Sequence, residues 1–318
     1  MDKEPVVSVL VITYNQAKFV EHALESVLGQ ETAFPIEILV GDDCSTDGTS
    51  GIITQFTADS RLRVFQRPCN LGATKNLYDL QTRARGRYIA YLEGDDYWKQ
   101  PDKLQKQVEF LEKHKEYIGC THRCEIVDEN GDSCKKQRLN WVCQKQIYTL
   151  KDFKGLMLPG HQSTLVHRNI FRSSQERYKD IITLNPLIAD RSLILLLVSF
   201  GPIYRLSECM SCYRVVQAGR GENATVVAYS GNANRVWDDY VYTKELEAYA
   251  KSVLDVDGGF EHHKKDLFVS AVYRVLREPN RVNRRVAKEI LREGNLFLYL
   301  VYLPIGFIKK TVNRLFYR

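Results

Sequence analysis

Three carboxylates follow one apolar segment of this chain. Residues 87–92 read Arg-Tyr-Ile-Ala-Tyr-Leu, which predicts a buried strand, and Glu93, Asp95 and Asp96 come directly after it. Like charges at the end of a buried strand repel one another and lose hydration, so they need a cation. Carboxylate oxygens suit Mg²⁺ or Mn²⁺, and such an ion usually completes its shell with water and substrate phosphates. The run therefore indicates metal-assisted handling of a diphosphate.

The elements that must position these carboxylates alternate between strands and helices. We predict strands at Val6–Ile12, Ile36–Val40, Leu62–Phe65 and Arg87–Leu92, and helices at Gln16–Leu28, Ile52–Phe56 and Leu71–Arg83. This alternation is typical of a parallel sheet with helices on both faces. Ligands bind such sheets at the carboxyl ends of the strands, where the polar clusters of this sequence lie.

The pattern changes after Trp98. We expect a helix over Pro101–His114, a strand over Tyr117–Asp128, an apolar helix over Arg191–Phe200, and short elements at Leu150–Leu158, Ser163–His167 and Ile203–Leu206. From Asn232 onward the chain reads as helical, with breaks near residues 255–259 and 278–280. No internal repeat is visible.

Composition bounds the possible partners. The 318 residues are 44% hydrophobic and 26% charged, with a net charge of +6, which suits an anionic ligand or membrane surface without requiring nucleic acid. The N-terminus shows no signal-peptide pattern, and the apolar stretch Leu296–Ile308 is too short to span a bilayer, so we expect a cytoplasmic protein. The eight cysteines then stay reduced, and a zinc site around Cys120 and Cys124 is the weaker alternative to ordinary core packing.

Four motifs agree in their order and spacing. Residues 9–15 end the first strand, residues 41–49 (Gly-Asp-Asp-Cys-Ser-Thr-Asp-Gly-Thr) follow the second, residues 70–76 open a helix, and residues 93–96 end the fourth strand. Together they resemble the inverting family 2 glycosyltransferases of GT-A fold, over about Pro5 to Val215. The resemblance implies a Rossmann-like mixed α/β sheet flanked by helices. It places a GT-A domain at 1–230, with a nucleotide-sugar-binding half at 1–98 and an acceptor half at 99–230, and a helical extension at 231–318.

The resemblance implies transfer of a sugar, with inversion, from a nucleotide diphosphate donor, with a UDP-sugar favoured. The acceptor would be a glycan or a lipid-linked saccharide in surface polysaccharide synthesis. The turns after the first two strands would hold the nucleoside through Thr13, Tyr14, Asn15, Asp42 and Asp43. A carboxylate can accept a hydrogen bond from a base, and an aromatic ring can stack on it. Turn formation and helix capping are the alternative roles for the two aspartates.

Two further positions would contact the diphosphate. Asn70 and Lys75 match a segment that usually reads Asn-x-Gly-x-x-x-Arg-Asn, and the lysine supplies a charge without the bidentate fork of arginine. A solvated helix face is the alternative for Lys75. The loop 217–223 could close over the donor and bring Arg220 to the diphosphate. The equal alternative is that this segment is an ordinary surface loop.

The acidic run matches the Asp-x-Asp motif of the family, with Glu93 first and Asp95 third. The resemblance implies a divalent cation, Mn²⁺ or Mg²⁺, with Asp95 as its first ligand and Asp96 as the next. Helix capping near Pro101 is the alternative reading.

Inverting transfer also needs a base that deprotonates the acceptor hydroxyl. Asp190, at the start of the apolar helix, matches the position of that base, and its alternative role is an N-cap. The histidine that often follows two residues after the family's arginine, here Arg214, is replaced by Val216. His161 is expected only to line the acceptor cleft.

The C-terminal residues 295–318 mix aromatic and aliphatic side chains with lysines and arginines. This composition fits an interfacial helix that makes the protein peripheral on an anionic membrane, and a helix docked on the domain is the alternative. Two other functions stay open. A nucleotidyltransferase of the same fold predicts a glycine-rich basic loop where residues 13–16 stand. A non-catalytic glycan-binding or scaffold protein would not require the acidic run.

Overall fold

One mixed sheet organises the molecule. The computed structural model describes residues 4–134, 137, 139–172, 178–186, 188–216, 234–293 and 299–307. Its strands are β1 (Val7–Thr13), β2 (Ile36–Asp42), β3 (Leu62–Gln66), β4 (Tyr88–Glu93), β5 (Tyr97–Trp98), β6 (Gly119–Val127), β7 (Ile147–Tyr148), β8 (Val166–Arg168) and β9 (Ile203–Arg214). They lie in the order β3-β2-β1-β4-β8-β6-β9-β5, with β7 paired to β9.

The first four strands form the parallel half of the sheet, as the sequence predicts. β1 pairs with β2 and with β4, and β2 pairs with β3, all in parallel register. Successive side chains of β1 point to opposite faces, so Val9 and Leu10 enter two separate hydrophobic cores. A strand buried on both faces must be apolar throughout, which explains the continuous hydrophobic runs of β1, β2 and β4.

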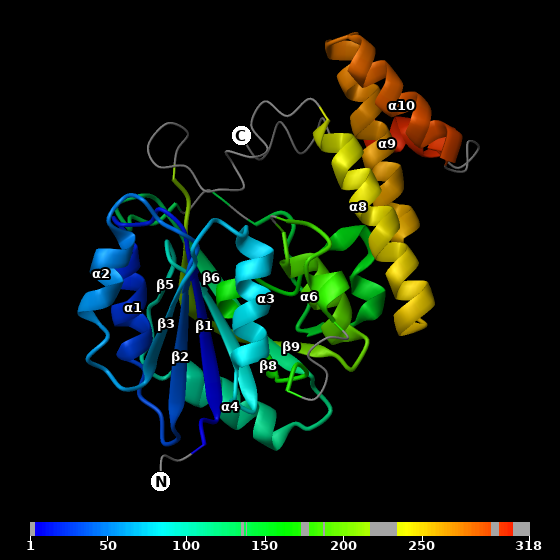
Figure 1. The fold of residues 1–318 in the computed structure, drawn as a ribbon. Helices are drawn as coiled ribbons and strands as arrows, with labels where there is room; N and C mark the ends of the chain where they lie inside the picture. The colour runs from blue at the N-terminus through cyan, green and yellow to red at the C-terminus, as the bar shows by residue number, and fades with distance from the viewer. Residues whose placement is uncertain are drawn as a thin grey trace.

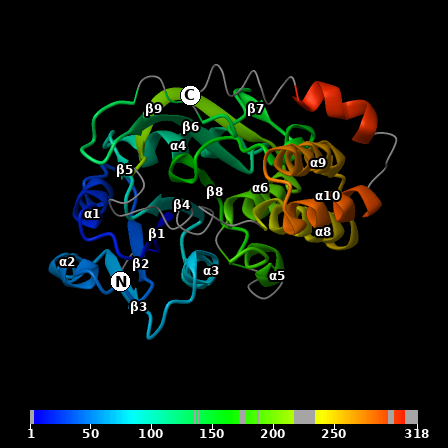
Figure 2. The ribbon, with the colours of Figure 1, turned by 90° about the horizontal axis from the view of Figure 1, so that it is seen from above.

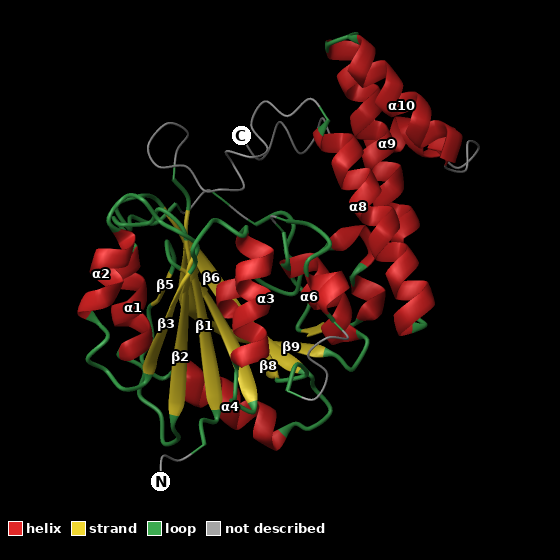
Figure 3. Ribbon diagram, in the orientation of Figure 1, coloured by secondary structure: helices red, strands yellow, loops and turns green. Residues whose placement is uncertain are grey.

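Helices cover both faces of the sheet (Figures 1 and 3). On one face lie α1 (Val20–Leu28), α2 (Thr49–Gln55) and α4 (Lys103–Lys113), which pack on the sheet through residues such as Val20, Ile53 and Leu104. On the other face lie α3 (Ala73–Arg83), α5 (Lys179–Ile182) and α6 (Asp190–Val198), represented by Leu77, Ile181 and Leu193.

The second half of the sheet reverses direction. β8 is antiparallel to β4 and to β6, β6 is parallel to β9, and β5 is antiparallel to β9. One sequence expectation needed correction here. β9 continues well beyond Leu206, because its far end pairs with β5 and β6. Residues 150–158 form the short 3₁₀ turns η1 (Leu150–Asp152) and η2 (Lys154–Leu156), whereas η3 (Gln162–Thr164) precedes β8.

The C-terminal helices stand beside the sheet, and Figure 2 shows them together at one end of the molecule. They are α8 (Arg235–Tyr249), which continues as the π-helical turn η4 (Ala250–Leu254), α9 (Phe260–Arg277), α10 (Arg281–Glu293) and a short helix at 299–307. The breaks predicted near 255–259 and 278–280 are confirmed. Tyr242, Leu246 and Phe260 join the core under α6, while Tyr240, Phe268 and other residues form a core of their own.

Within the described residues, no helix combines the length and the hydropathy needed to cross a bilayer. The described part of the tail, 299–307, packs on α9: Tyr299 is fully buried and stacks on Phe268, and the Tyr302 hydroxyl donates a hydrogen bond to Asp266. Residues 295–298 and 308–318 lie outside the described residues.

Candidate active site

The carboxyl ends of β1, β2 and β4 lie side by side. The parallel register places Thr13 opposite Asp42, and Ile12 opposite Glu93. Because these strands run in the same direction, the loops that follow them share one edge of the sheet. The polar clusters after the three strands therefore meet at this edge.

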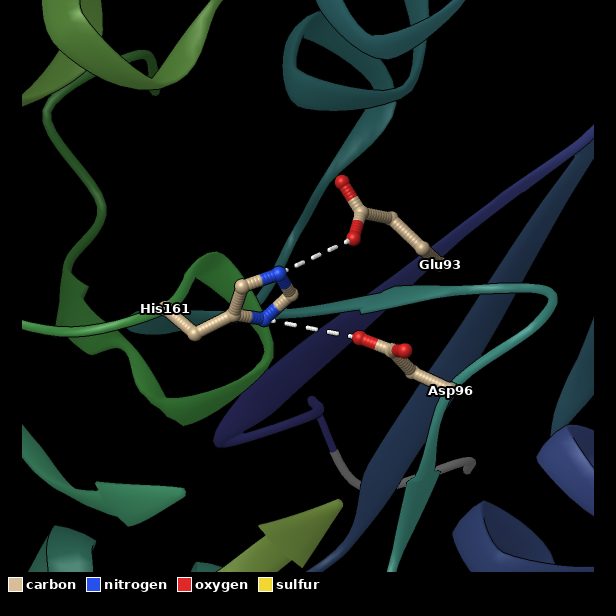
Figure 4. Close-up of side chains that lie close together, drawn as sticks. All are labelled: Glu93, Asp96 and His161. Carbon is tan, nitrogen blue, oxygen red and sulfur yellow. Dashed lines mark ion pairs between the residues drawn. The ribbon is translucent and has the colours of Figure 1, made fainter. Parts of the chain in front are cut away.

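An acidic and imidazole cluster lies where β4 ends (Figure 4). His161 Nε2 lies 3.6 Å from Glu93 Oε2, and its Nδ1 lies 3.4 Å from Asp96 Oδ2. One potential ligand atom from each of the three residues falls within 4.8 Å of the others. Among the described residues, this is the group of histidine, cysteine and carboxylate side chains whose geometry suits a metal ion. No described cysteine belongs to such a group.

Antiparallel pairing brings His161 to the cluster. Ala90 of β4 lies opposite Val166 of β8, so the chain that precedes β8 runs alongside the chain that follows β4. His161 caps η3 just before β8, and its Nδ1 accepts a hydrogen bond from the Ser163 amide. The sequence analysis placed His161 only in the acceptor cleft. Recognising its contact with the acidic run requires knowing that β8 pairs with β4, which no local pattern reveals.

The electrostatics of the cluster favour a bound cation. Burial raises the pKa of Glu93, and the charges of Asp95 and Asp190 raise it further. Burial also raises the pKa of Asp96, with added repulsion from Asp95 and Glu93. Asp96 Oδ2 is buried and accepts no hydrogen bond from the described residues. Burial lowers the pKa of His161 to about 3, so its imidazole is neutral at neutral pH and can act as a ligand.

These observations fit a divalent cation. The residues that would hold it are Glu93, Asp96 and His161: an unsatisfied carboxylate oxygen, a second carboxylate and a neutral imidazole. Oxygen and imidazole ligands together suit Mn²⁺, and the carboxylates alone suit Mg²⁺. Asp95 lies outside this group. Its pKa is raised by burial and lowered by its own backbone, by Arg214 and by a hydrogen bond with Gln16. The geometry thus favours Asp96 as a metal ligand. From the sequence, Asp95 is expected to be the first ligand and Asp96 the next.

Arg214 holds the acidic turn in place. Its backbone amide donates to Asp96 Oδ1 at 2.9 Å, and its Nε donates to the Asp95 carbonyl at 2.9 Å. The guanidinium also donates to the carbonyl of Glu129 and lies 4.6 Å from the ring centre of Phe19. The β5–β9 pairing places it here, because Tyr97 lies opposite Cys212. From the sequence, Arg214 is only a residue that matches the family's arginine, and its contact with the acidic turn is not predicted.

Asp190 approaches the same cluster from α6. It is the first residue of that helix, and Ala189 occupies the N-cap position. Burial raises the pKa of Asp190, and the Arg191 charge partly opposes the shift. Asp190 and His161 line one pocket, whose other walls include Leu158 and Leu193. A carboxylate with a raised pKa beside a pocket has the properties expected of a general base.

The two aspartates after β2 hold their own loops. Asp42 accepts hydrogen bonds from Ser45 and from the Ser50 hydroxyl. Asp43 accepts from the backbone amides of Leu71 at 2.7 Å and Gly72 at 2.9 Å. Asp43 therefore holds the turn that precedes α3, which is the turn-forming role left open as an alternative. Contact of either aspartate with a nucleoside stays a prediction.

The turn after β1 is tied to the loop after β2. Asn15, with φ of 53°, accepts a hydrogen bond from the Thr46 amide through Oδ1, and its own amide donates to Ser45 Oγ. Thr13 Oγ1 is buried and has no hydrogen-bond partner in the described part of the chain. The Tyr14 side chain is 41% exposed, so its ring is available to a ligand.

Three residues are predicted to contact the diphosphate. Asn70 Oδ1 accepts from the Gly72 amide at 2.9 Å, inside the turn that Asp43 also holds. Lys75 is exposed on the first turn of α3. Arg220 lies outside the described residues. All three assignments stay predictions.

Comparisons with known proteins agree with this arrangement. Residues 8–174 match the model of Glycosyl transferase family 2. TuaG of Bacillus subtilis, a glycosyltransferase assigned to teichuronic acid biosynthesis, is 30% identical over 221 residues, which cover 69% of this chain and 83% of TuaG.

Two solved structures share the fold. Residues 1–349 of S. aureus TarS, in complex with UDP-GlcNAc, superpose with a TM-score of 0.65 at 18% identity, over 90% of this chain and 79% of that one. The mannosyltransferase PcManGT of Pyrobaculum calidifontis, in complex with GDP-Man and Mn²⁺, gives a TM-score of 0.53 at 15% identity, over 99% and 88%. At these identities the similarity shows the GT-A fold with C-terminal helices.

Proposed function

Because this chain belongs to glycosyl transferase family 2, we propose that it transfers a sugar from a nucleoside-diphosphate donor to a glycan or lipid-linked acceptor, with inversion and with the help of a divalent cation. The observation that carries the proposal is the cluster of Glu93, Asp96 and His161 at the carboxyl end of β4, with Asp190 beside it. The cluster joins a candidate cation site to a candidate base.

The cation, held by Glu93, Asp96 and His161, would neutralise charge that develops on the leaving diphosphate. The chain's own residues perform the remaining tasks. Arg214 fixes the backbone of the acidic turn, and Ser163 fixes the imidazole of His161. Both contacts hold the side chains in one geometry before the donor arrives, which reduces the cost of reorganisation.

Asp190 is the candidate base. Inversion requires that the acceptor hydroxyl attack the face of the sugar opposite the leaving group, and a carboxylate must take its proton as the new bond forms. The raised pKa of Asp190 makes it a stronger proton acceptor than an exposed aspartate. Asp190 and His161 line one small cavity, so the acceptor hydroxyl would approach Asp190 close to the candidate cation site.

The donor nucleoside would lie on the turns after β1 and β2, near Tyr14, Asn15 and Asp42, with Asn70, Lys75 and Arg220 toward the diphosphate. A uridine nucleotide is the first candidate, supported by the UDP-GlcNAc complex of TarS. The GDP-Man complex of PcManGT makes a guanosine donor the alternative. Relatedness to TuaG supports a role in surface polysaccharide synthesis. We also propose that the enzyme works on the cytoplasmic side of a membrane.

A thermal-shift panel tests the proposal. Nucleotide sugars based on uridine, guanosine, thymidine and cytidine are added with Mn²⁺ or with excess chelator. A ligand that binds the folded state raises the apparent melting temperature. At a concentration 100 times its dissociation constant, it adds about 2.7 kcal/mol to the free energy of unfolding. We expect one nucleotide class to raise it, and more so with Mn²⁺. A panel without any shift would point to a non-catalytic role, and stabilisation by a nucleoside triphosphate alone would point to a nucleotidyltransferase.

A further inference from the structure

The short helix at 299–307 exposes an entirely apolar face. Tyr299 and Gly306 face α9, and the Cβ of any residue replacing Gly306 would come within 2.4 Å of Val269. On the opposite face, Leu300, Val301 and Ile305 are 51%, 56% and 58% exposed, and Pro304 lies between them. At 3.6 residues per turn these four positions form one stripe. An amphipathic helix normally turns polar residues outward, and no described residue covers this stripe.

α10, which leads into this segment, carries a cationic stripe. Its buried positions are Asn283, Val286 and Ile290. The opposite face bears cations at spacings of three and four residues: Arg281, Arg284, Arg285, Lys288 and Arg292. In the part of the chain that the structure describes, none of these five forms an ion pair, and the neighbouring Glu293 is paired with Lys244 instead.

The two helices that carry these stripes lie at the same end of the molecule. In Figures 1 and 2, α10 and the helix at 299–307 lie at the right-hand side, away from the parallel half of the sheet. In Figure 1, α10 lies toward the top of the view, the side to which the carboxyl ends of β1 and β2 point. Leu276, in the last turn of α9, is 69% exposed.

We propose that these two helices form a docking surface for an anionic lipid bilayer. The apolar stripe at 299–307 enters the interface between headgroups and acyl chains, and the α10 stripe lies against anionic headgroups. Charge complementarity alone would also fit a nucleic acid, but a polyanion offers nothing to cover Leu300, Val301 and Ile305. A bilayer satisfies both stripes. This surface goes beyond sugar transfer, and binding to it requires neither donor nor acceptor.

Vesicle sedimentation of the full chain tests the proposal. Phosphatidylcholine vesicles with and without one-third phosphatidylglycerol are compared at increasing salt. We expect binding to the anionic vesicles that weakens but persists at high salt, because the apolar part of the contact is not screened. The variant Leu300→Ser with Ile305→Ser should reduce partitioning about tenfold or more. Ile147→Ser, an equally exposed apolar residue on β7, is the matched control and should bind like the parent.

The electrostatic part has its own variant. Arg284→Glu with Lys288→Glu should weaken binding to anionic vesicles about tenfold or more at low salt and have little effect on neutral ones. Lys113→Glu with Lys151→Glu, exposed cations on α4 and η1, is the matched control. If all variants bind vesicles like the parent, the docking surface is wrong. Heparin binding that falls with the α10 variant while vesicle binding is unchanged would identify a polyanion site instead.

A second measurement guards against misfolding of a variant. Ile305→Trp places a fluorophore on the outward stripe without removing apolar area. We expect bromine-labelled lipids to quench this variant more strongly than the parent, whose three tryptophans lie elsewhere. Equal quenching would overturn the proposal, because it would show that the stripe does not enter the bilayer. Since no substrate is present, failure here leaves the proposed transferase activity untouched.

Discussion

His161 Nδ1 accepts a hydrogen bond from the Ser163 amide, and this orientation directs Nε2 at Glu93. Trp98 Nε1 and Ser211 Oγ both donate to the Ser163 carbonyl, so the imidazole is oriented by a chain of buried contacts. Such support around a metal ligand commonly changes metal affinity by about 10–100-fold when it is lost. These contacts therefore hold the His161 imidazole in one orientation, ready to bind a cation.

His161→Ala should lower the affinity for Mn²⁺ at least about tenfold, because the imidazole ligand is lost while both carboxylates remain. Isothermal titration with Mn²⁺ measures the effect. His114→Ala, which removes an exposed imidazole at the end of α4, is the control and should leave the affinity unchanged. Unchanged affinity in His161→Ala would remove this residue from the ligand set.

Asp190→Asn keeps the size of the side chain and removes its basicity. We expect donor affinity within a few-fold of the parent and turnover lower by about 10²-fold or more. Donor binding by calorimetry and product formation under the same conditions separate the two effects. Near-normal turnover would leave Asp190 as a residue of the α6 terminus and the base unassigned.

The carboxyls of Glu93, Asp95 and Asp96 all have pKa values raised by burial. Above the ordinary carboxyl pKa of about 4, these three groups bind more protons in the folded state than in the unfolded state, so their contribution to stability falls as the pH rises. Buried histidines such as His161, whose pKa is lowered to about 3, act in the opposite direction up to about pH 6.5, so the carboxyl effect is read above that pH. We expect urea unfolding in chelator to show this fall toward neutral pH. Mn²⁺, which favours the ionised forms, should flatten it, and so should Asp96→Asn. A metal-free stability that changes with pH above about 6.5 by the same amount in the parent and in Asp96→Asn would contradict the assignment.

At the scale of elements, local periodicity predicts the parallel half well. The four strands, the helices between them and the clustering at their carboxyl ends follow from apolar patterns and turn residues. The antiparallel half does not, because β5 and β8 have only two and three residues and their partners are distant in the chain. Those pairings bring Arg214 and His161 to the acidic turn. The sequence therefore identified the carboxylates and missed the residues that orient them.

Gly94 shows how closely the elements approach one another. A Cβ at this position would lie 2.3 Å from Gln16 Oε1 and 2.8 Å from Thr13 Cβ. Gly94→Ala should displace the turn after β1, destabilise the protein by about 1–3 kcal/mol and weaken donor binding. Gly51→Ala is the matched control: a Cβ there meets nothing within 4 Å, and inside α2 alanine should stabilise by about 0.5–1 kcal/mol. Urea unfolding measures the stability of both variants, and titration with the donor measures their donor binding. A Gly94→Ala variant with unchanged stability and unchanged donor binding would contradict the close packing at this position.

At the scale of the whole molecule, the C-terminal helices share the core of the sheet. Tyr242 of α8 and Phe260 of α9 are buried with residues of α6, and the Ser192 and Tyr242 hydroxyls lie 2.9 Å apart. Because Asp190 begins α6, these helices support the element that carries the candidate base. The division of the chain at residue 230 stays a prediction, and the shared core indicates that a fragment ending there would lose part of its hydrophobic burial.

The central claim is that this site uses a cation and Asp190 to move a sugar from a nucleotide donor. The most direct measurement is release of nucleoside diphosphate from the stabilising nucleotide sugar, with Mn²⁺ and with excess chelator, in the parent and in Asp190→Asn. The account predicts release that requires the cation and falls by about 10²-fold or more in the variant. If the parent in chelator and the Asp190→Asn variant with Mn²⁺ both release nucleoside diphosphate as fast as the parent with Mn²⁺, this mechanism is wrong.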